Sequence, residues 1–202
     1  MFMNKDQNLI NEFAIKTLKE NLNVMYAQIW REGQLTAEYK RMPVKTRLNT
    51  WSACKGVVSC AAGIALDEGL IRLDEKIVDI FPEYAPENPE GYLGDVTLEN
   101  MLTMTTGLES SLFFCDWPER YTTPDWIRYF FENAKVIKKP GTEWLYSNFN
   151  TYMISCAIEK RAGVNLLEYL RNRFFEPLGI GNPDWTLCPP TFAETTPETE
   201  DR

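Results

Sequence analysis

The fold is decided by residues 51–70, which read WSACKGVVSCAAGIALDEGL. From Lys55 onward apolar residues fill most positions and leave almost no polar face, which predicts a buried helix. Gly69 is placed to end this helix, because glycine adopts the left-handed backbone that helix ends often require. Ser52 follows the polar segment 45–50 directly, so we expect it near the N-terminus of the helix.

Ser52 and Lys55 form an S-x-x-K pattern that suits nucleophilic catalysis. Side chains three residues apart lie on one face of a helix. A helix N-terminus favours developing negative charge and offers free backbone N–H groups, so the Ser52 N–H can form half of an oxyanion hole. The pattern is short enough to arise by accident. The alternative is that Ser52 caps the helix while Lys55 extends along it to solvent.

The chain contains no histidine. This excludes a Ser-His-Asp triad, a Cys-His dyad and any histidine-ligated metal site. If Ser52 is a nucleophile, a lysine, a tyrosine or a carboxylate must therefore move its proton. The five cysteines include no C-x-x-C pair, so we expect no metal and no cofactor. Cys60 and Cys156 lie among small apolar residues, which is typical of buried cysteines.

A second polar cluster is Tyr146-Ser147-Asn148, which follows a Pro140-Gly141 turn and precedes a predicted helix. A tyrosine acts as a base only where cations lower its pKa, which is about 10 in water. Lys55 is a suitable cation if the fold brings the two together. The Asn148 amide can orient a substrate carbonyl or fix Lys55. On its own, the cluster also fits a buried aromatic residue beside a capping asparagine.

The remaining pattern predicts a helix, a β-hairpin and then a long, mostly helical region. Residues 8–20 predict an amphipathic helix, and residues 24–30 and 35–41 predict strands joined around Glu32-Gly33. Five further helices carry cap or stop signals. They are 75–81 after Asp74, a short helix from Thr97 to 103, a helix from Thr123-Pro124 to about 134, 150–161 before Gly163, and 165–175 from Asn165.

Composition excludes several classes of protein. An apolar content of 44% is typical of a globular protein, and a net charge of −8 argues against nucleic acid or an anionic membrane as a partner. No run of eighteen apolar residues is present, so no membrane span is expected. The first twenty residues lack the apolar core of a secretory signal, which predicts a cytoplasmic location.

The motifs together resemble a known family. Ser52-x-x-Lys55, followed later by Tyr146-x-Asn148, is similar to the class C β-lactamases and to related DD-peptidases and esterases, the penicillin-binding-protein-like serine hydrolases. Other segments in the same order add to the likeness, which runs from about residue 24 to 187. They are Gly63 to Ile77, the Leu102–Leu108 segment LTMTTGL where the family usually has LTHTSGL, Pro140-Gly141, and Glu176 to Ile180.

The resemblance implies an α+β fold, in which an antiparallel sheet flanked by helices joins a mostly helical region. It also implies that Ser52 is the acylated nucleophile, that Lys55 and Tyr146 share the work of the general base, and that Asn148 holds the substrate. The substrate would be a small ester, amide or β-lactam, cleaved through an acyl-enzyme. The oligomeric state is left open.

The resemblance is incomplete at the C-terminal side. The family's third motif, K-T-G or a variant on a late strand, is absent after Tyr146. We therefore interpret residues 1–187 as the N-terminal portion of a hydrolase domain that lacks the last strands, with hairpin strands over 24–41 and a helical region over 52–187. Residues 188–202 are rich in Pro, Thr and Glu and are predicted to be a disordered tail, native or frameshifted.

Two functions stay open on the sequence alone. The first is a serine hydrolase that is impaired by the missing motif, because losing one oxyanion donor costs about 10²–10³ in rate. The second is a non-catalytic binding or sensor protein, or an inactive fragment, that retains the fold. The presence of all four residues of the S-x-x-K and Y-x-N patterns favours the hydrolase.

Overall fold

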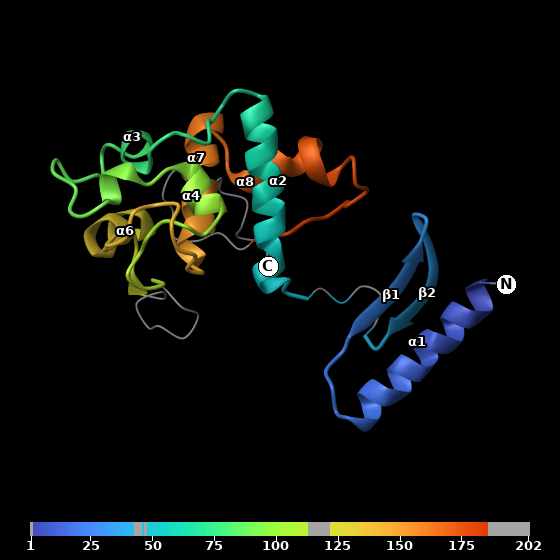
Figure 1. Cartoon of the computed structure of the whole chain (residues 1–202). Coiled ribbons are helices and arrows are strands. Elements are labelled where there is room, and N and C mark those ends of the chain that lie inside the picture. Colours follow the sequence, from blue (N-terminus) through green and yellow to red (C-terminus); the bar gives the residue numbers. More distant parts are fainter. Residues whose placement is uncertain (1, 43–45, 47, 113–121, 186–202) are drawn as a thin grey trace. The chain divides into compact units, whose positions relative to one another are not determined.

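A computed structural model of the chain describes residues 2–42, 46, 48–112 and 122–185 (Figure 1). The chain divides into two compact units, residues 1–50 and 51–202. Helices combine with one antiparallel sheet, in agreement with the predicted α+β class. The predicted tail, residues 188–202, lies outside the described residues. No helix in the described ranges is both long enough and apolar enough to cross a membrane.

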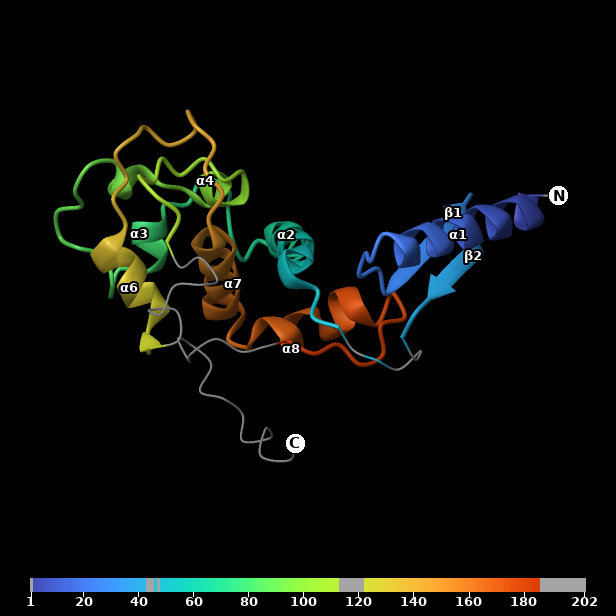
Figure 2. The same cartoon turned by 90° about the horizontal axis from the view of Figure 1, so that it is seen from below.

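The first unit is one helix on one hairpin. Helix α1 (Phe2–Lys19) lies alongside strands β1 (Tyr26–Arg31) and β2 (Gln34–Lys40) in both Figure 1 and Figure 2. The strands pair antiparallel and are joined by Glu32-Gly33, as predicted. Both turn residues have positive φ, 49° and 76°, which is the backbone that a two-residue hairpin turn requires.

An ion pair with a buried carboxylate fastens α1 to the hairpin. Asp6 is 1% exposed and accepts two hydrogen bonds from the Arg31 guanidinium, both at 2.7 Å, and a third from Thr36 at 2.6 Å. The hydrogen bonds from Arg31 and Thr36 outweigh the desolvation and lower the pKa of Asp6 to about 2. A carboxylate inside this small unit is therefore tolerated because its charge is paired and its lone pairs are used.

The second unit is mostly helical and holds the larger core. Its elements are η1 (Trp51–Ala53), α2 (Cys54–Asp67), α3 (Ile77–Ile80), η2 (Leu93–Asp95), α4 (Leu98–Leu102), α6 (Trp126–Asn133), α7 (Asn148–Ala162), α8 (Leu166–Leu170) and η3 (Arg171–Phe175). Helix α7 contacts α2, α4 and α8, so it occupies the centre of the unit. The core around the N-terminal half of α7 is aromatic, because Phe149 packs there against Tyr129, Phe130 and Tyr152.

Helix α2 is buried on one face only, which corrects the prediction of a helix buried all round. Its buried residues recur at helical spacing and face α7: Val58, Ala61, Ala62 and Ala65. The opposite face is exposed among the described residues and includes Cys60, so the prediction that Cys60 is buried is wrong. Cys156, in contrast, is 1% exposed inside α7, as predicted.

Two predicted helix starts are also wrong. Asp74 does not cap the helix after it, because its carboxylate pairs with Arg72 at 3.0 Å and α3 begins only after Lys76. The helix predicted from Thr123-Pro124 starts at Trp126, and the side chain of Asp125 caps it by accepting the Arg128 N–H. In the first case Arg72 competes for the carboxylate. In the second, two polar residues near the helix were possible caps, and spacing alone did not choose between them.

Three other helix ends agree with the sequence. Thr97 forms a capping box at the start of α4, and the Asn165 side chain accepts the Glu168 N–H at the start of α8. Gly163 ends α7 in the left-handed conformation with φ 71°. These caps satisfy backbone groups that a helix end leaves without partners.

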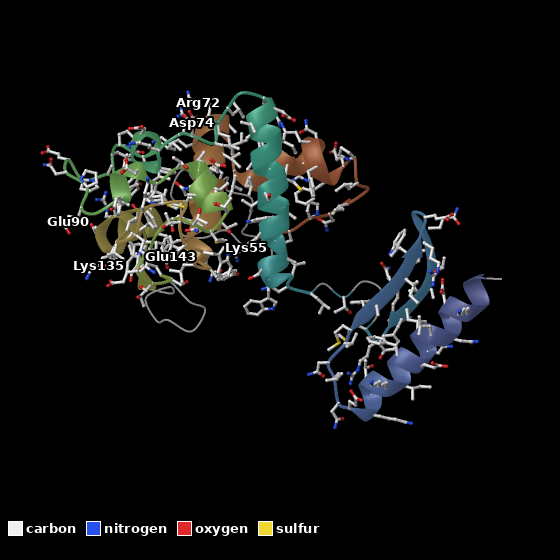
Figure 3. The ribbon with its side chains drawn as sticks, in the orientation of Figure 1. Lys55, Arg72, Asp74, Glu90, Lys135 and Glu143 are labelled. Carbon is white, nitrogen blue, oxygen red and sulfur yellow. The ribbon has the colours of Figure 1, made fainter. Side chains whose placement is uncertain are left out.

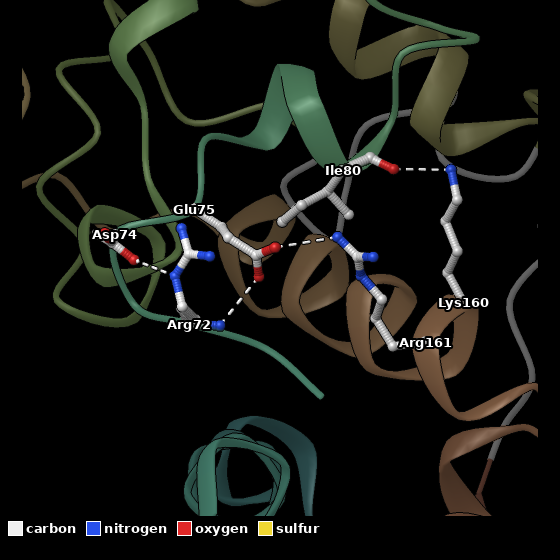
Figure 4. A network of polar contacts seen from close by, with 6 residues as sticks. All are labelled: Arg72, Asp74, Glu75, Ile80, Lys160 and Arg161. Carbon is white, nitrogen blue, oxygen red and sulfur yellow. Dashed lines mark hydrogen bonds and ion pairs between the residues drawn. The ribbon is translucent and has the colours of Figure 1, made fainter. Parts of the chain in front are cut away.

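Long-range ion pairs connect the loop after α2 to the end of α7 (Figure 4). Glu75 accepts the Arg72 backbone N–H and a hydrogen bond from the Arg161 guanidinium at 3.0 Å. One residue earlier on α7, the Lys160 ammonium donates to the Ile80 carbonyl at 2.7 Å and to Glu83 at the same distance. The loop therefore has fixed attachments to α7 besides its apolar contacts.

Candidate active site

Ser52 lies at the entrance to helix α2. It sits in the short 3-10 turn η1, which leads directly into α2, so its N–H belongs to the first turn, where backbone donors have no intrahelical partner. Its hydroxyl shares a hydrogen bond of 2.8 Å with the Tyr146 hydroxyl and accepts one from Lys55. The Ser52 side chain is therefore engaged by Tyr146 and Lys55 instead of capping the helix.

Lys55 is the centre of the polar cluster. Its ammonium donates to Ser52 Oγ at 3.2 Å and to Asn148 Oδ1 at 2.9 Å, and it lies 5.0 Å from the centroid of the Tyr146 ring. Figure 3 shows Lys55 on the first turn of α2, on the side of that helix that faces α7. The structure thus brings together Ser52, Lys55, Tyr146 and Asn148, all within the second unit.

The environment of Tyr146 favours loss of its proton. Burial by itself would raise the pKa of the hydroxyl, but the nearby Lys55 ammonium and the hydrogen bond with Ser52 lower it. The net effect is a pKa below the ordinary value of 10. This is the direction that the sequence interpretation required of a tyrosine base beside a lysine.

The segment before Tyr146 is held by a loop that the sequence interpretation did not single out as part of the site. The Leu145 N–H donates to the Met104 carbonyl at 2.9 Å, and the Gly141 N–H donates to the Thr105 carbonyl at 2.7 Å. Met104 adopts a positive φ of 58°, which is uncommon for a residue with a side chain. The only sequence signal for this support is the segment Leu102–Leu108, which the resemblance included without assigning it a role.

Gly107 sets how closely that loop approaches the Tyr146 segment. The Ile137 and Lys138 N–H groups both donate to the Gly107 carbonyl. A Cβ at position 107 would lie 2.1 Å from the Lys138 carbonyl oxygen, and the backbone there has φ 80°. Glycine is therefore required at this position twice over, for its conformation and for the space.

The cluster contains groups that can activate a serine hydroxyl. A hydroxyl at a helix start lies within hydrogen-bond reach of a tyrosine with a lowered pKa, and a cation bridges the hydroxyl and an amide. This is the relationship of nucleophile, base and orienting group that activates a serine. It requires no histidine.

Comparison with known proteins agrees with this geometry. The family model named Beta-lactamase matches residues 13–200. The chain belongs to the β-lactamase family. The resemblance stated from the sequence motifs is thereby confirmed, although the match by itself assigns no role to any residue.

Curated members of the family with known names are similar to about two thirds or more of this chain. The lovastatin esterase of Penicillium rubens is 28% identical over 155 residues, which cover 64% of this chain and 37% of the esterase. A β-lactamase of Escherichia coli is 27% identical over 153 residues, which cover 75% of this chain and 38% of that enzyme. The chain therefore spans about two fifths of the length of these β-lactamase-family relatives.

Solved structures show the same fold. A class C β-lactamase superposes with a TM-score of 0.71 at 18% identity, over 90% of this chain and 51% of that one. An octameric penicillin-binding protein homologue from Pyrococcus abyssi superposes with a TM-score of 0.67 at 21% identity, over 87% and 44%. The predicted β-lactamase and DD-peptidase-like fold is confirmed, and the likeness extends to about half of each neighbour.

Proposed function

We propose that the chain carries the nucleophile and general-base machinery of a serine hydrolase that works through an acyl-enzyme. The observation that supports this most strongly is the Ser52–Tyr146 hydrogen bond of 2.8 Å between residues 94 positions apart. A chance S-x-x-K pattern on a helix would not be expected to place its hydroxyl against a tyrosine with a lowered pKa. The alternative of a protein that only binds has no comparable support.

In the proposed reaction Tyr146 takes the proton of Ser52 while Ser52 Oγ forms a bond to the carbonyl carbon of the substrate. The Ser52 N–H stabilises the negative charge that develops on the carbonyl oxygen. Tyr146 then returns the proton to the leaving alcohol or amine, and water hydrolyses the acyl-enzyme by the reverse route. The positive charge of Lys55 stabilises the ionised form of Tyr146. Asn148 holds Lys55 in place through a 2.9 Å hydrogen bond.

The proposed substrates are small acyl compounds, namely esters, amides or β-lactams. Curated relatives include proteins named as an esterase, a β-lactamase and acyltransferases, so the acceptor in the second step can differ among them. A cytoplasmic location stays a prediction, and it would favour a small ester or amide over peptidoglycan.

The test is covalent labelling of the 202-residue chain with a fluorophosphonate, followed by intact mass and peptide mapping. We expect one adduct on Ser52 and none in Ser52→Ala. Lys55→Met and Tyr146→Phe should slow labelling by about 10²–10⁴, the usual contribution of general-base catalysis. The labelling rate should rise with pH through the lowered pKa of Tyr146, below 10, and Tyr146→Phe should lose this rise.

Ser59 provides a matched control, because it is an exposed serine on α2, seven residues after Ser52. Ser59→Ala should label at the rate of the unmodified chain. An adduct that persists in Ser52→Ala, or a folded chain that takes no adduct at all, would contradict the proposal.

Labelling is a better readout than turnover for this chain. The K-T-G motif of the family is absent after Tyr146, so the oxyanion donor that its strand supplies is not expected from these residues. A missing donor slows the reaction but leaves the nucleophile reactive. We therefore propose that acylation is detectable while turnover is slow.

A further inference from the structure

The largest exposed apolar side chains of the described residues lie beside the candidate active site. Trp51 is 70% exposed and Trp144 is 67% exposed, the two highest values among the large apolar residues described. Trp51 is joined directly to Ser52, and Trp144 precedes Tyr146 by two residues. We call Trp51 and Trp144 the tryptophan pair.

The other described tryptophans of the second unit are less exposed. Trp126 is 9% exposed, and Trp185 packs against the core. Single exposed apolar residues are ordinary on protein surfaces. Here, however, the two most exposed ones both adjoin the same four polar residues, although they lie far apart in the sequence. This coincidence points to a common role at the site.

The backbone at Trp51 adds an independent observation. Trp51 has φ 49°, the left-handed region, which is an outlier for a bulky residue. Strained residues of this kind gather at active sites and ligand clamps, where the surrounding structure maintains them. The turn η1 therefore holds the Trp51 side chain in a direction that relaxed backbone at this position would not give.

Trp144 is oriented by the catalytic tyrosine itself. The ring centroids of Trp144 and Tyr146 are 6.4 Å apart, with an angle of 48° between their planes. This spacing lies within the range of attractive aromatic pairs. A substrate group that contacts Trp144 would therefore lie close to the hydroxyl that exchanges the proton.

We propose that the tryptophan pair binds the acyl side of the substrate, so that the site prefers acyl groups that carry an aromatic ring or a similarly bulky apolar group over acetyl. This inference rests on the proposed serine hydrolase function. The acyl group is the part that stays bonded to Ser52 Oγ in the acyl-enzyme, next to Trp51. Aromatic and apolar groups gain most from a surface of this kind, because water is displaced from both partners.

The covalent test compares two fluorophosphonates with the same leaving group, one carrying a methyl and the other a phenyl group on phosphorus. We expect the phenyl probe to label Ser52 at least about tenfold faster, which corresponds to about 1.4 kcal/mol. After each rate is divided by the hydrolysis rate of the same probe in buffer, the double variant Trp51→Ala with Trp144→Ala should bring the ratio close to one. Because both probes meet the same variant, a general loss of reactivity cancels in the ratio.

Trp30→Ala is the matched control, since Trp30 is 58% exposed but lies on β1 in the other unit. It should leave the ratio unchanged. If both probes label Ser52 and the double variant keeps the ratio, the inference is wrong while the proposed function stands. If neither probe labels Ser52, the proposed function has failed.

A second measurement tests the inference without any covalent step. In the Ser52→Ala chain labelled with ¹⁵N, methyl phenylacetate should shift the indole N–H signals of Trp51 and Trp144, assigned through Trp51→Phe and Trp144→Phe. The Trp30 signal should not move, and methyl acetate at the same concentration should shift none of them. Absence of these shifts would overturn the inference whatever Ser52 does with the probes.

Discussion

The two halves of the candidate site lie at the starts of helices α2 and α7, and the burial of each helix differs from what its sequence suggests. Helix α2 is the more apolar of the two, yet it buries only Val58, Ala61, Ala62 and Ala65. Helix α7 contains charged and amide residues, yet it buries Phe149, Asn150, Met153, Ile154, Cys156, Ala157 and Ile158. Composition shows which helix can be buried, whereas the arrangement of neighbours decides which one is.

The neighbours explain the contrast. Helix α7 packs against α2, α4 and α8, while α2 packs against α7 and the turn η1. Asn148 is therefore the first residue of an element that is supported from several sides, and Tyr146 lies just before it. Lys55 lies on an element supported from one side, and Ser52 lies in the turn that leads into it. We expect the site to tolerate change along α2 better than change along α7.

The largest effect should come from removing an aromatic side chain at the start of α7. Phe149 is 1% exposed and contacts three aromatic rings, so Phe149→Ala should lower the free energy of unfolding by about 3–5 kcal/mol. Leu66→Ala on α2, where the side chain is 39% exposed, should cost about 1 kcal/mol or less. Urea unfolding followed by fluorescence compares them, and equal losses would contradict the contrast between the helices.

A smaller effect should come from the loop that supports the Tyr146 segment. Alanine at position 107 should lower the free energy of unfolding by about 1–2 kcal/mol because of the left-handed backbone. Its Cβ would also overlap the Lys138 carbonyl, which adds to the loss. Gly163→Ala is the matched control, because Gly163 has φ 71° but nothing within 4 Å of an added Cβ. Its free energy of unfolding should fall only by the amount that the left-handed backbone costs an alanine.

The two glycine variants should also differ in reactivity. Gly107→Ala displaces the segment that ends at Tyr146, so fluorophosphonate labelling of Ser52 should slow. Gly163→Ala acts at the far end of α7 and should label normally. If both variants lose stability and reactivity equally, the close approach at Gly107 has no special role.

The meeting of the four polar residues was predictable because they belong to two short patterns whose order resembles that of a known family. The absence of histidine limited any base to other side chains, and the role of Tyr146 as that base stays a prediction. The hairpin turn at Glu32-Gly33 and the cap at Gly163 were predictable for the same reason, since each depends on a few adjacent residues.

The remaining features depend on which distant segments meet. The exposed face of α2 and the side chain of Cys60 could not be predicted, because an apolar helix gives no sign of how many sides its neighbours cover. Asp74 was misassigned as a cap because Arg72, two residues away, competes for its carboxylate. The support of Tyr146 by the Met104 carbonyl uses backbone atoms, which leave no pattern in the sequence.

The smallest effect should be a pH-dependent one at the C-terminal end of α7. Glu159 is mostly buried, and this burial raises its pKa above the ordinary 4.5, although its carboxylate accepts the Leu166 N–H at 2.8 Å. The folded state thus binds a proton more tightly than the unfolded state does. Protonated Glu159 therefore favours the folded state relative to ionised Glu159. This stabilisation is lost as pH rises through the raised pKa.

Glu159→Gln keeps the oxygen that accepts the Leu166 N–H and removes the charge. Its Tm should exceed that of the unmodified chain at neutral pH, and the difference should vanish below pH 4.5. Glu168→Gln is the control of opposite sign, because hydrogen bonding with Arg171 lowers the pKa of Glu168 and its charge is stabilising. That variant should have the lower Tm at neutral pH and lose the difference in acid. If both variants shift Tm in the same direction at neutral pH, burial at the end of α7 does not control the charge of Glu159.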